Sequence, residues 1–159
     1  MSSVEFRNAL GCFTTGVCLI SVNDGRTGPL ALTANSFSSV SLEPPLILWS
    51  IQNDSECFRE YTECQEFGVS VLCADQGLLS SHYARKDNHA VRSVDFEYNT
   101  LGVPLLKRSA ARFSCRRWEL HAAGDHHIIV GEVVDFDASS EAPLLFSRGA
   151  YGQLAAQPG

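Results

Sequence analysis

Residues 32–49, LTANSFSSVSLEPPLILW, decide the fold of this chain of 159 residues. A strand usually alternates polar with bulky apolar side chains, so that one face packs against a core. In this stretch the polar positions hold only small hydroxyl or amide side chains: Thr33, Asn35, Ser36, Ser38, Ser39 and Ser41. We expect a single serine-rich strand, which ends at Pro44-Pro45 and precedes an apolar strand over 46–51. Such small side chains let a flat polar ligand approach the backbone closely, whereas a serine-rich edge strand or loop is the simpler alternative.

The hydrophobic pattern on either side of this stretch predicts mainly strands. A short amphipathic helix opens the chain, because apolar residues recur at helical spacing from Val4 to Phe13. Residues 16–22 form a nearly continuous apolar run rich in β-branched side chains, which is typical of a buried strand. Further strands are expected at 67–73, 112–121, 126–136 and 144–146.

Only short helices and one long loop are expected between these strands. Asn53-Asp54-Ser55 and Asp75 are candidate N-caps for two helices, at 57–61 and 78–83. Residues 85–104 show no clean period and predict a long surface loop. Strands and helices do not alternate, which favours a mainly antiparallel β-barrel with peripheral helices over a doubly wound parallel sheet. No linker or internal repeat is visible, so residues 1–159 are expected to form one domain.

Composition limits the classes of partner. The formal net charge of −6 argues against nonspecific binding to nucleic acid or to an anionic membrane, since both require a basic surface. The first residues lack the pattern of a signal peptide, and no apolar run is long enough to span a bilayer. The six cysteines form no C-x-x-C pair, and several lie within apolar runs, as expected of reduced core thiols. Together these features predict a cytoplasmic protein.

Common nucleotide-binding and catalytic motifs are missing from the sequence. The glycines form no G-x-G pattern, and there is no P-loop, no G-x-S-x-G and no H-E-x-x-H. If this chain handles a dinucleotide, it does so without the usual glycine-rich turn. The segment Asn53-Asp54-Ser55 at a helix start can favour a phosphate, although ordinary capping explains it equally well. Arg85, Lys86 and Arg148 are isolated cations that alone indicate little.

A pair of histidines, His126 and His127, follows Gly124-Asp125 at the start of a strong strand. Adjacent residues on a strand point to opposite faces, so one histidine can face a cleft while the other packs or faces solvent. Both faces of this strand are mostly apolar, and the alternation alone does not choose between them. A metal site at His121, Asp125 and His126 lacks a convincing third and fourth protein ligand, and a structural histidine is the simpler alternative for each ring.

Taken in order, these segments resemble the short-chain flavin reductase family, whose members have the FMN-binding split-barrel fold. The resemblance extends from Phe6 to Tyr151 and rests on FRNALGCFTTGV, LTANSFSSVSLEPPLIL, NDSEC, FGVSVL, GDHHIIVGEVVDF and PLLFSRGAY. The second and fifth of these segments are the most specific. The implied fold is a mainly β, split antiparallel β-barrel with a few peripheral helices.

The resemblance also implies a set of site residues. Thr33, Ala34, Asn35 and Ser36, with Ser38 and Ser39 beyond them, would line the edge of the flavin ring. Ser50 and Ser55 would lie near the ribityl chain or phosphate, Arg85 would add positive charge, and Tyr151 matches a closing aromatic residue. His126 would lie beside the nicotinamide. Two positions depart from the pattern, because Cys57 replaces a serine or threonine and His127 stands where relatives vary.

The implied function is an NAD(P)H-dependent flavin reductase. Hydride would pass from NADH, or NADPH, to FMN or FAD, and the reduced flavin would be supplied to a partner monooxygenase. The family implies a homodimer with each flavin near the subunit interface. A noncatalytic flavin- or heme-binding sensor on the same barrel is the alternative from another class. An oxidase of the pyridoxamine-phosphate type would need a basic phosphate cluster, which this acidic chain lacks.

Overall fold

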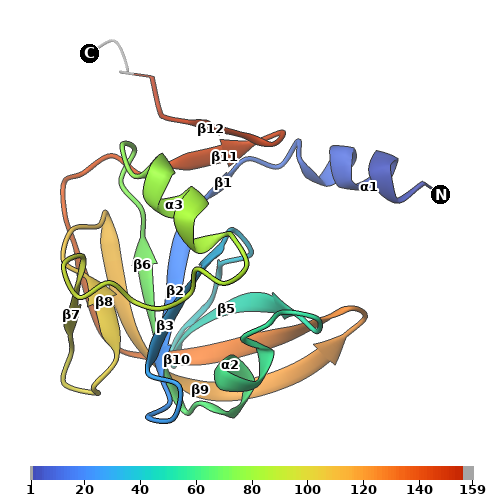
Figure 1. Ribbon diagram of the computed structural model, residues 1–159. Coiled ribbons are helices and arrows are strands. Elements are labelled where there is room, and N and C mark those ends of the chain that lie inside the picture. The colour runs from blue at the N-terminus through green and yellow to red at the C-terminus, as the bar shows by residue number, and fades with distance from the viewer. Residues whose placement is uncertain (1, 156–159) are drawn as a thin grey trace.

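A seven-stranded antiparallel sheet dominates the computed structural model, which describes residues 2–155 (Figure 1). The strands follow the order β3-β2-β6-β9-β10-β5-β4. Their bounds are β2 Cys18–Asn23, β3 Pro29–Ala34, β4 Ser38–Leu42, β5 Pro45–Gln52, β6 Glu66–Val71, β9 Ala111–Ala123 and β10 His126–Ala138. The mainly β, antiparallel architecture expected from the sequence is therefore confirmed.

The serine-rich stretch joins the two edges of this sheet. It was expected to be one strand, and that prediction is wrong: it forms the end of β3, a break at 35–37, and then β4. β3 and β4 lie at opposite ends of the strand order, yet only three residues separate them. Four consecutive Cα–Cα steps reach at most ~15 Å. The sheet must therefore curl until its edges approach each other, which produces a barrel that is split along this side.

The inside of the barrel is packed with apolar and aromatic side chains. Trp49 is fully buried and contacts the rings of Tyr61 and Phe67, with centroids 5.4 and 6.3 Å away. Tyr61 belongs to α2, Phe58–Glu63, which covers one end of the barrel, and its hydroxyl donates to the carbonyl of Ile20 at 2.7 Å. β2 is buried on both faces, as the apolar run at 16–22 predicts.

A second layer covers the outside of β2 and β3. It contains α3, Gly77–Tyr83, and a small sheet of β1, Thr15–Gly16, β11, Leu145–Ser147, and β12, Ala150–Gly152. A hairpin of β7, Phe96–Tyr98, and β8, Pro104–Leu106, completes it. The surface loop predicted for 85–104 is therefore only partly correct, because Phe96 and Val103 are buried. These strands are too short to show a recognisable period in the sequence.

Neither predicted helix cap forms. α3 begins at Gly77, and Asp75 instead binds Arg108 on the surface at 2.9 Å. α2 begins at Phe58 and also has no side-chain cap. Asn53 is used elsewhere, because its amide nitrogen donates to the carbonyl of Gly124 at 3.2 Å and ties β5 to the β9–β10 turn.

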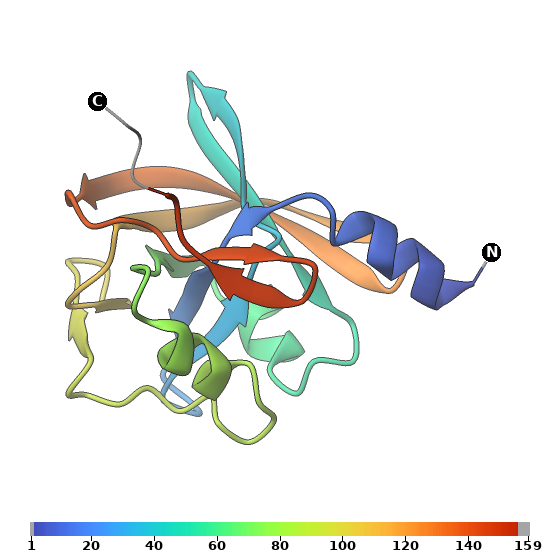
Figure 2. The same ribbon diagram turned by 90° about the horizontal axis from the view of Figure 1, so that it is seen from above.

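The first helix, α1, Ser3–Leu10, projects from the rest of the molecule, as Figures 1 and 2 show. It has the predicted position and ends at Gly11, but none of its residues is buried. In Figure 2 the β4–β5 hairpin also projects beyond the barrel. Among residues 2–155, no helix is both long and apolar enough to cross a membrane.

Candidate functional site

A cavity of about 400 Å³ lies at the split in the barrel. The break after β3 and the end of β5 form its walls, together with the start of β10 and the segment that follows α3. This volume falls within the range of small-molecule sites, ~300–1,000 Å³. The cavity brings together seven of the residues that the sequence singled out: Thr33, Ala34, Asn35, Ser36, Ser50, Ser55 and His126.

Strand register explains why β5 and β10 present polar groups to the cavity. His126 is paired with Gln52, and Ile128 with Ser50, so these four side chains share one face of the sheet. The alternate residues face the barrel interior, where Ile51 is buried. One face of β5 and β10 thus carries polar side chains, while the other packs into the barrel core. A ligand in the cavity would therefore rest directly on a well-packed wall.

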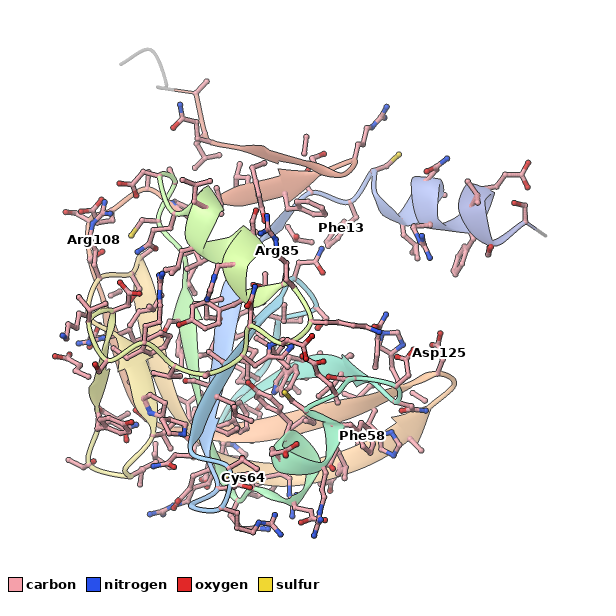
Figure 3. The ribbon with its side chains drawn as sticks, viewed as in Figure 1. Phe13, Phe58, Cys64, Arg85, Arg108 and Asp125 are labelled. Carbon is pink, nitrogen blue, oxygen red and sulfur yellow. The ribbon has the colours of Figure 1, made fainter. Side chains whose placement is uncertain are left out.

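The two histidines have different surroundings. The His126 side chain is 36% exposed and lines the cavity, and its Nδ1 lies 2.7 Å from a carboxylate oxygen of Asp125. The ring of His127 instead packs edge-on against Phe58, at 5.0 Å between centroids, and its Nδ1 contacts the Asn53 amide oxygen at 2.7 Å. Figure 3 shows Asp125 at the tip of the β9–β10 hairpin and Phe58 beside it on α2. His126 is thus the histidine that faces the cavity.

Asp125 fixes the tautomer of His126. The hydrogen bond from His126, followed by the charge of its ring, lowers the pKa of Asp125, so this carboxylate is ionised at neutral pH. An ionised carboxylate can only accept, hence Nδ1 of His126 carries the hydrogen. In the neutral ring, Nε2 is then an acceptor, available to a donor in the cavity.

Two hydroxyl groups of the serine-rich stretch are engaged within the protein. Ser36 Oγ accepts from the backbone N–H of Ser50 at 2.9 Å and donates to its carbonyl at 3.1 Å, so it pairs with β5 where the β4 ladder has ended. Thr33 Oγ1 donates to the carbonyl of Ser80 on α3 at 2.6 Å. These two side chains hold the cavity wall in place.

The break at 35–37 leaves the strand ladders, since β3 pairing ends at Ala34 and β4 pairing begins at Ser38. Backbone groups that leave a ladder need other partners. Asn35 also lines two neighbouring cavities, of about 950 and 180 Å³, so it lies where the three meet. Backbone and amide groups, more than hydroxyls, are therefore what this wall offers to a ligand.

Four of the residues singled out lie outside the cavity lining. Ser38 and Ser39 are exposed on β4, beyond the break. Arg85 is exposed next to α3, as Figure 3 shows, while the adjacent Lys86 lines the cavity. Tyr151 lines the neighbouring 180 Å³ cavity, and its hydroxyl is 2.7 Å from Ser80 Oγ.

Other cavity residues were missed in the sequence. Gln52 could have been found, because it lies two positions after Ser50 on the same strand face. Glu56 and His89 carry no such signal, and Lys86 stands out in the sequence only as a cation beside Arg85. They lie in irregular segments, and only the packing of those segments against β3 and β5 brings them together.

Cys57, which departs from the family pattern, is poorly suited to contact an anion. Its side chain is buried and does not belong to the cavity lining among the described residues. Burial, with the negative charges of Glu60 and Glu56, raises the pKa of its thiol to about 11. A neutral thiol is only a weak hydrogen-bond donor.

The donor set fits a flavin. The ring edge of a flavin carries both donors and acceptors, which backbone groups at 34–36, the Ser50 hydroxyl and the Gln52 amide can match. Lys86 supplies a cation for a phosphate, and His126 offers an acceptor in the same cavity. The flavin ring must also come close to the protein backbone, and the small side chains from Thr33 to Ser36 leave room for this.

Comparisons with known proteins agree with this assignment. The family model for the flavin reductase like domain matches residues 10–155. The FMN reductase (NADH) SmoA of Agrobacterium fabrum is 46% identical over 156 residues, which cover 98% of this chain and 88% of that protein. The reductase component of the flavin-dependent trigonelline monooxygenase of Acinetobacter baylyi is 34% identical, and the chain spans about half of it, 47%.

A solved structure shows the same similarity in three dimensions. The NADH:FAD oxidoreductase SgcE6 of Streptomyces globisporus, in complex with NAD and FAD fragments, superposes with a TM-score of 0.90 at 34% identity. The match covers 96% of this chain and 92% of that one.

Proposed function

The chain belongs to the flavin reductase-like domain family, and on that premise we propose that it is an NADH-dependent reductase of FMN or FAD. We further propose that it supplies reduced flavin to a monooxygenase, as the name of the Acinetobacter relative describes for that protein. The single observation that supports this most is the shared cavity, in which the wall of small residues at 33–36 and His126 face the same space.

The protein's own task in this reaction is to bind and orient. A bound flavin supplies the redox chemistry by accepting a hydride from the nicotinamide. Residues 34–36, Ser50, Gln52 and Ser55 hold the flavin by backbone and side-chain hydrogen bonds, and the cavity wall excludes water from one side of the ring. Lys86, rather than Arg85, provides the nearest positive charge for a phosphate because it lines the cavity. Tyr151 shapes the adjoining cavity through its contact with α3.

His126 orients the nicotinamide in this proposal. Its Nε2 accepts a hydrogen bond from the carboxamide of NADH, while Asp125 holds the ring and its tautomer. No proton has to move in the hydride step, so His126 acts as a binding group and not as an acid or base.

A spectrophotometric experiment tests the proposed function. The purified protein is mixed with NADH, and the NADH absorbance is followed with and without added FMN or FAD. We expect rapid NADH loss that depends on flavin and on protein concentration. A bound chromophore without turnover would instead indicate the noncatalytic flavin- or heme-binding sensor.

We also propose that the protein forms a homodimer through α1. An isolated helix of eight residues is only marginally stable in water, since helices below ~12–15 residues rarely persist alone. Phe6 and Leu10 lie four residues apart on α1 and are 54% and 58% exposed, and Phe13, just beyond the helix, is 80% exposed. An exposed apolar helix face of this kind requires a partner surface, and a second copy of the chain provides one.

Charges on this face should separate the subunits. We expect the double variant Phe6→Glu, Leu10→Glu to be monomeric at concentrations at which the wild-type protein is dimeric, because two carboxylates would have to be buried in the interface. Sedimentation velocity measures the change. Val94→Glu is the control. Val94 is also an exposed apolar side chain, at 73%, but it does not belong to α1, so this variant should remain dimeric. A double variant that remains dimeric would contradict the role of α1.

A further inference from the structure

Two irregular segments are joined beside the cavity by one carboxylate. Glu56 lies just before α2, and Asp87 and His89 lie in the segment that follows α3. A single oxygen of Glu56, Oε1, accepts from the backbone N–H of Asp87 at 2.6 Å and lies 2.8 Å from Nε2 of His89. The side chains of Glu56 and His89 are only 33% and 13% exposed. These contacts connect the two sides of the cavity mouth.

His89 is also fixed to the barrel. Its Nδ1 lies 3.1 Å from the carbonyl of Ala31 on β3, and its own carbonyl accepts from the N–H of Ala31 at 2.8 Å. Each ring nitrogen of His89 therefore faces an acceptor, the carbonyl of Ala31 on β3 or the carboxylate of Glu56. The segment after α3 cannot move away from the cavity without breaking these contacts.

The backbone between these contacts has an unusual conformation. Asp87 has φ of +64°, which is uncommon for a residue other than glycine. A residue keeps such a conformation only when its surroundings determine it. Aspartate adopts this region more readily than most residues, and here its N–H is also bound to Glu56, directly after Lys86 on the cavity wall.

We propose that Glu56, together with His89, positions Lys86 to recognise the phosphate of a bound flavin. Among the described residues that line the cavity, Lys86 is the only lysine or arginine. The backbone N–H of Asp87 and the ring of His89 contact the Glu56 carboxylate, so it repels an incoming phosphate less than a carboxylate without partners would. This inference rests on the proposed function, and it makes Glu56 and His89 positioning residues that act through Lys86.

A matched control carboxylate, Asp54, lies two residues before Glu56 in the sequence. Asp54 lines the same cavity but forms no hydrogen bond or ion pair with another residue of the described range 2–155. Removing it takes away the same charge without releasing the segment after α3. The comparison of Glu56→Ala with Asp54→Ala therefore separates positioning from charge.

Titration with two flavins tests the proposal, using quenching of flavin fluorescence to measure affinity. Riboflavin lacks the phosphate that FMN carries. We expect Glu56→Ala to weaken FMN binding about tenfold or more, the loss of a charge-assisted hydrogen bond, and to leave riboflavin binding within about twofold. Asp54→Ala should not weaken either. Glu56→Gln keeps an acceptor for the N–H of Asp87 and should retain more FMN affinity than Glu56→Ala.

A double variant tests whether Glu56 acts through Lys86. Lys86→Ala should reproduce the loss for FMN, and adding Glu56→Ala to it should cause little further loss, because coupled residues are not additive. Hydrogen exchange without ligand gives an independent readout. Amides at 85–89 should exchange faster in Glu56→Ala than in the wild-type protein or in Asp54→Ala.

Two results would overturn the inference. One is a Glu56→Ala variant that loses affinity for FMN and riboflavin equally, or loses none. The other is a Glu56→Ala variant whose amides at 85–89 exchange hydrogen at the wild-type rate. If Glu56→Ala does not fold, His89→Gln takes its place in the same titrations, with the same criteria. A wild-type protein that binds neither flavin would refute the proposed function, and the inference would fall with it. If the wild-type protein binds both flavins and only the variants behave differently from expectation, the inference alone fails.

Discussion

Replacing His126 with alanine is expected to raise the apparent Michaelis constant for NADH about tenfold, with less than about a twofold change in the dissociation constant of the flavin. The reason is geometric. His126 faces the cavity, and its Nε2 has no hydrogen-bond partner among residues 2–155, whereas the proposed flavin contacts come from the backbone at 34–36 and from β5. Loss of the imidazole removes an acceptor for the nicotinamide and leaves the flavin wall intact.

Stopped-flow reduction at varied NADH measures the His126 effect directly. His127→Ala is the control, because that ring packs against Phe58 and Asn53 outside the cavity. It should leave the dependence of the rate on NADH unchanged even if it lowers stability. A His126→Ala protein with wild-type NADH dependence would remove this residue from the nicotinamide site.

Gly68→Ala is expected to cause a large loss of stability. A Cβ at Gly68 would lie 2.6 Å from Leu105 Cδ2 and 2.8 Å from Ser21 Oγ, which donates to the carbonyl of Pro104. That carbonyl, a backbone group, would be 3.0 Å away. The β7–β8 hairpin packs so closely on β6 that a methyl group requires backbone movement, which costs about 3 kcal/mol.

Thermal unfolding checks this prediction. For a chain of this size, 3 kcal/mol lowers the melting temperature by about 6–12 °C. Gly16→Ala is the matched control, because a Cβ there meets nothing within 4 Å and should change stability by less than about 0.5 kcal/mol. Both variants are compared at one protein concentration, since assembly affects the midpoint. A Gly68→Ala protein that melts with the wild type would show that the hairpin is loosely packed.

The fold could be predicted from the sequence wherever one residue pattern continued for long enough. The apolar run at 16–22 and the two long strands β9 and β10 are examples, and the structure confirms them. The serine-rich stretch predicts one strand, because its small polar residues continue across the break at 35–37. Nothing local shows that its two halves belong to opposite edges of the sheet, since this depends on how all seven strands close.

The candidate site was predictable in part for the same reason. The alternation of side chains placed His126 and His127 on opposite faces, but only the register of β10 against β5 shows which face holds the cavity. The resemblance implies that Ser36 lines the flavin edge, yet its hydroxyl pairs with the backbone of Ser50. Glu56 and His89 meet through contacts between segments far apart in the chain, and no pattern along the sequence encodes such a meeting.

The short connection between β3 and β4 constrains how this protein can change over evolutionary time. Loops usually tolerate inserted residues, because lengthening them costs little free energy. The connection at 35–37 differs, since an insertion would shift two strand registers and one wall of the cavity together. New ligand preferences must therefore arise here by exchange of side chains at constant length, while changes in length are confined to connections that do not form the cavity wall.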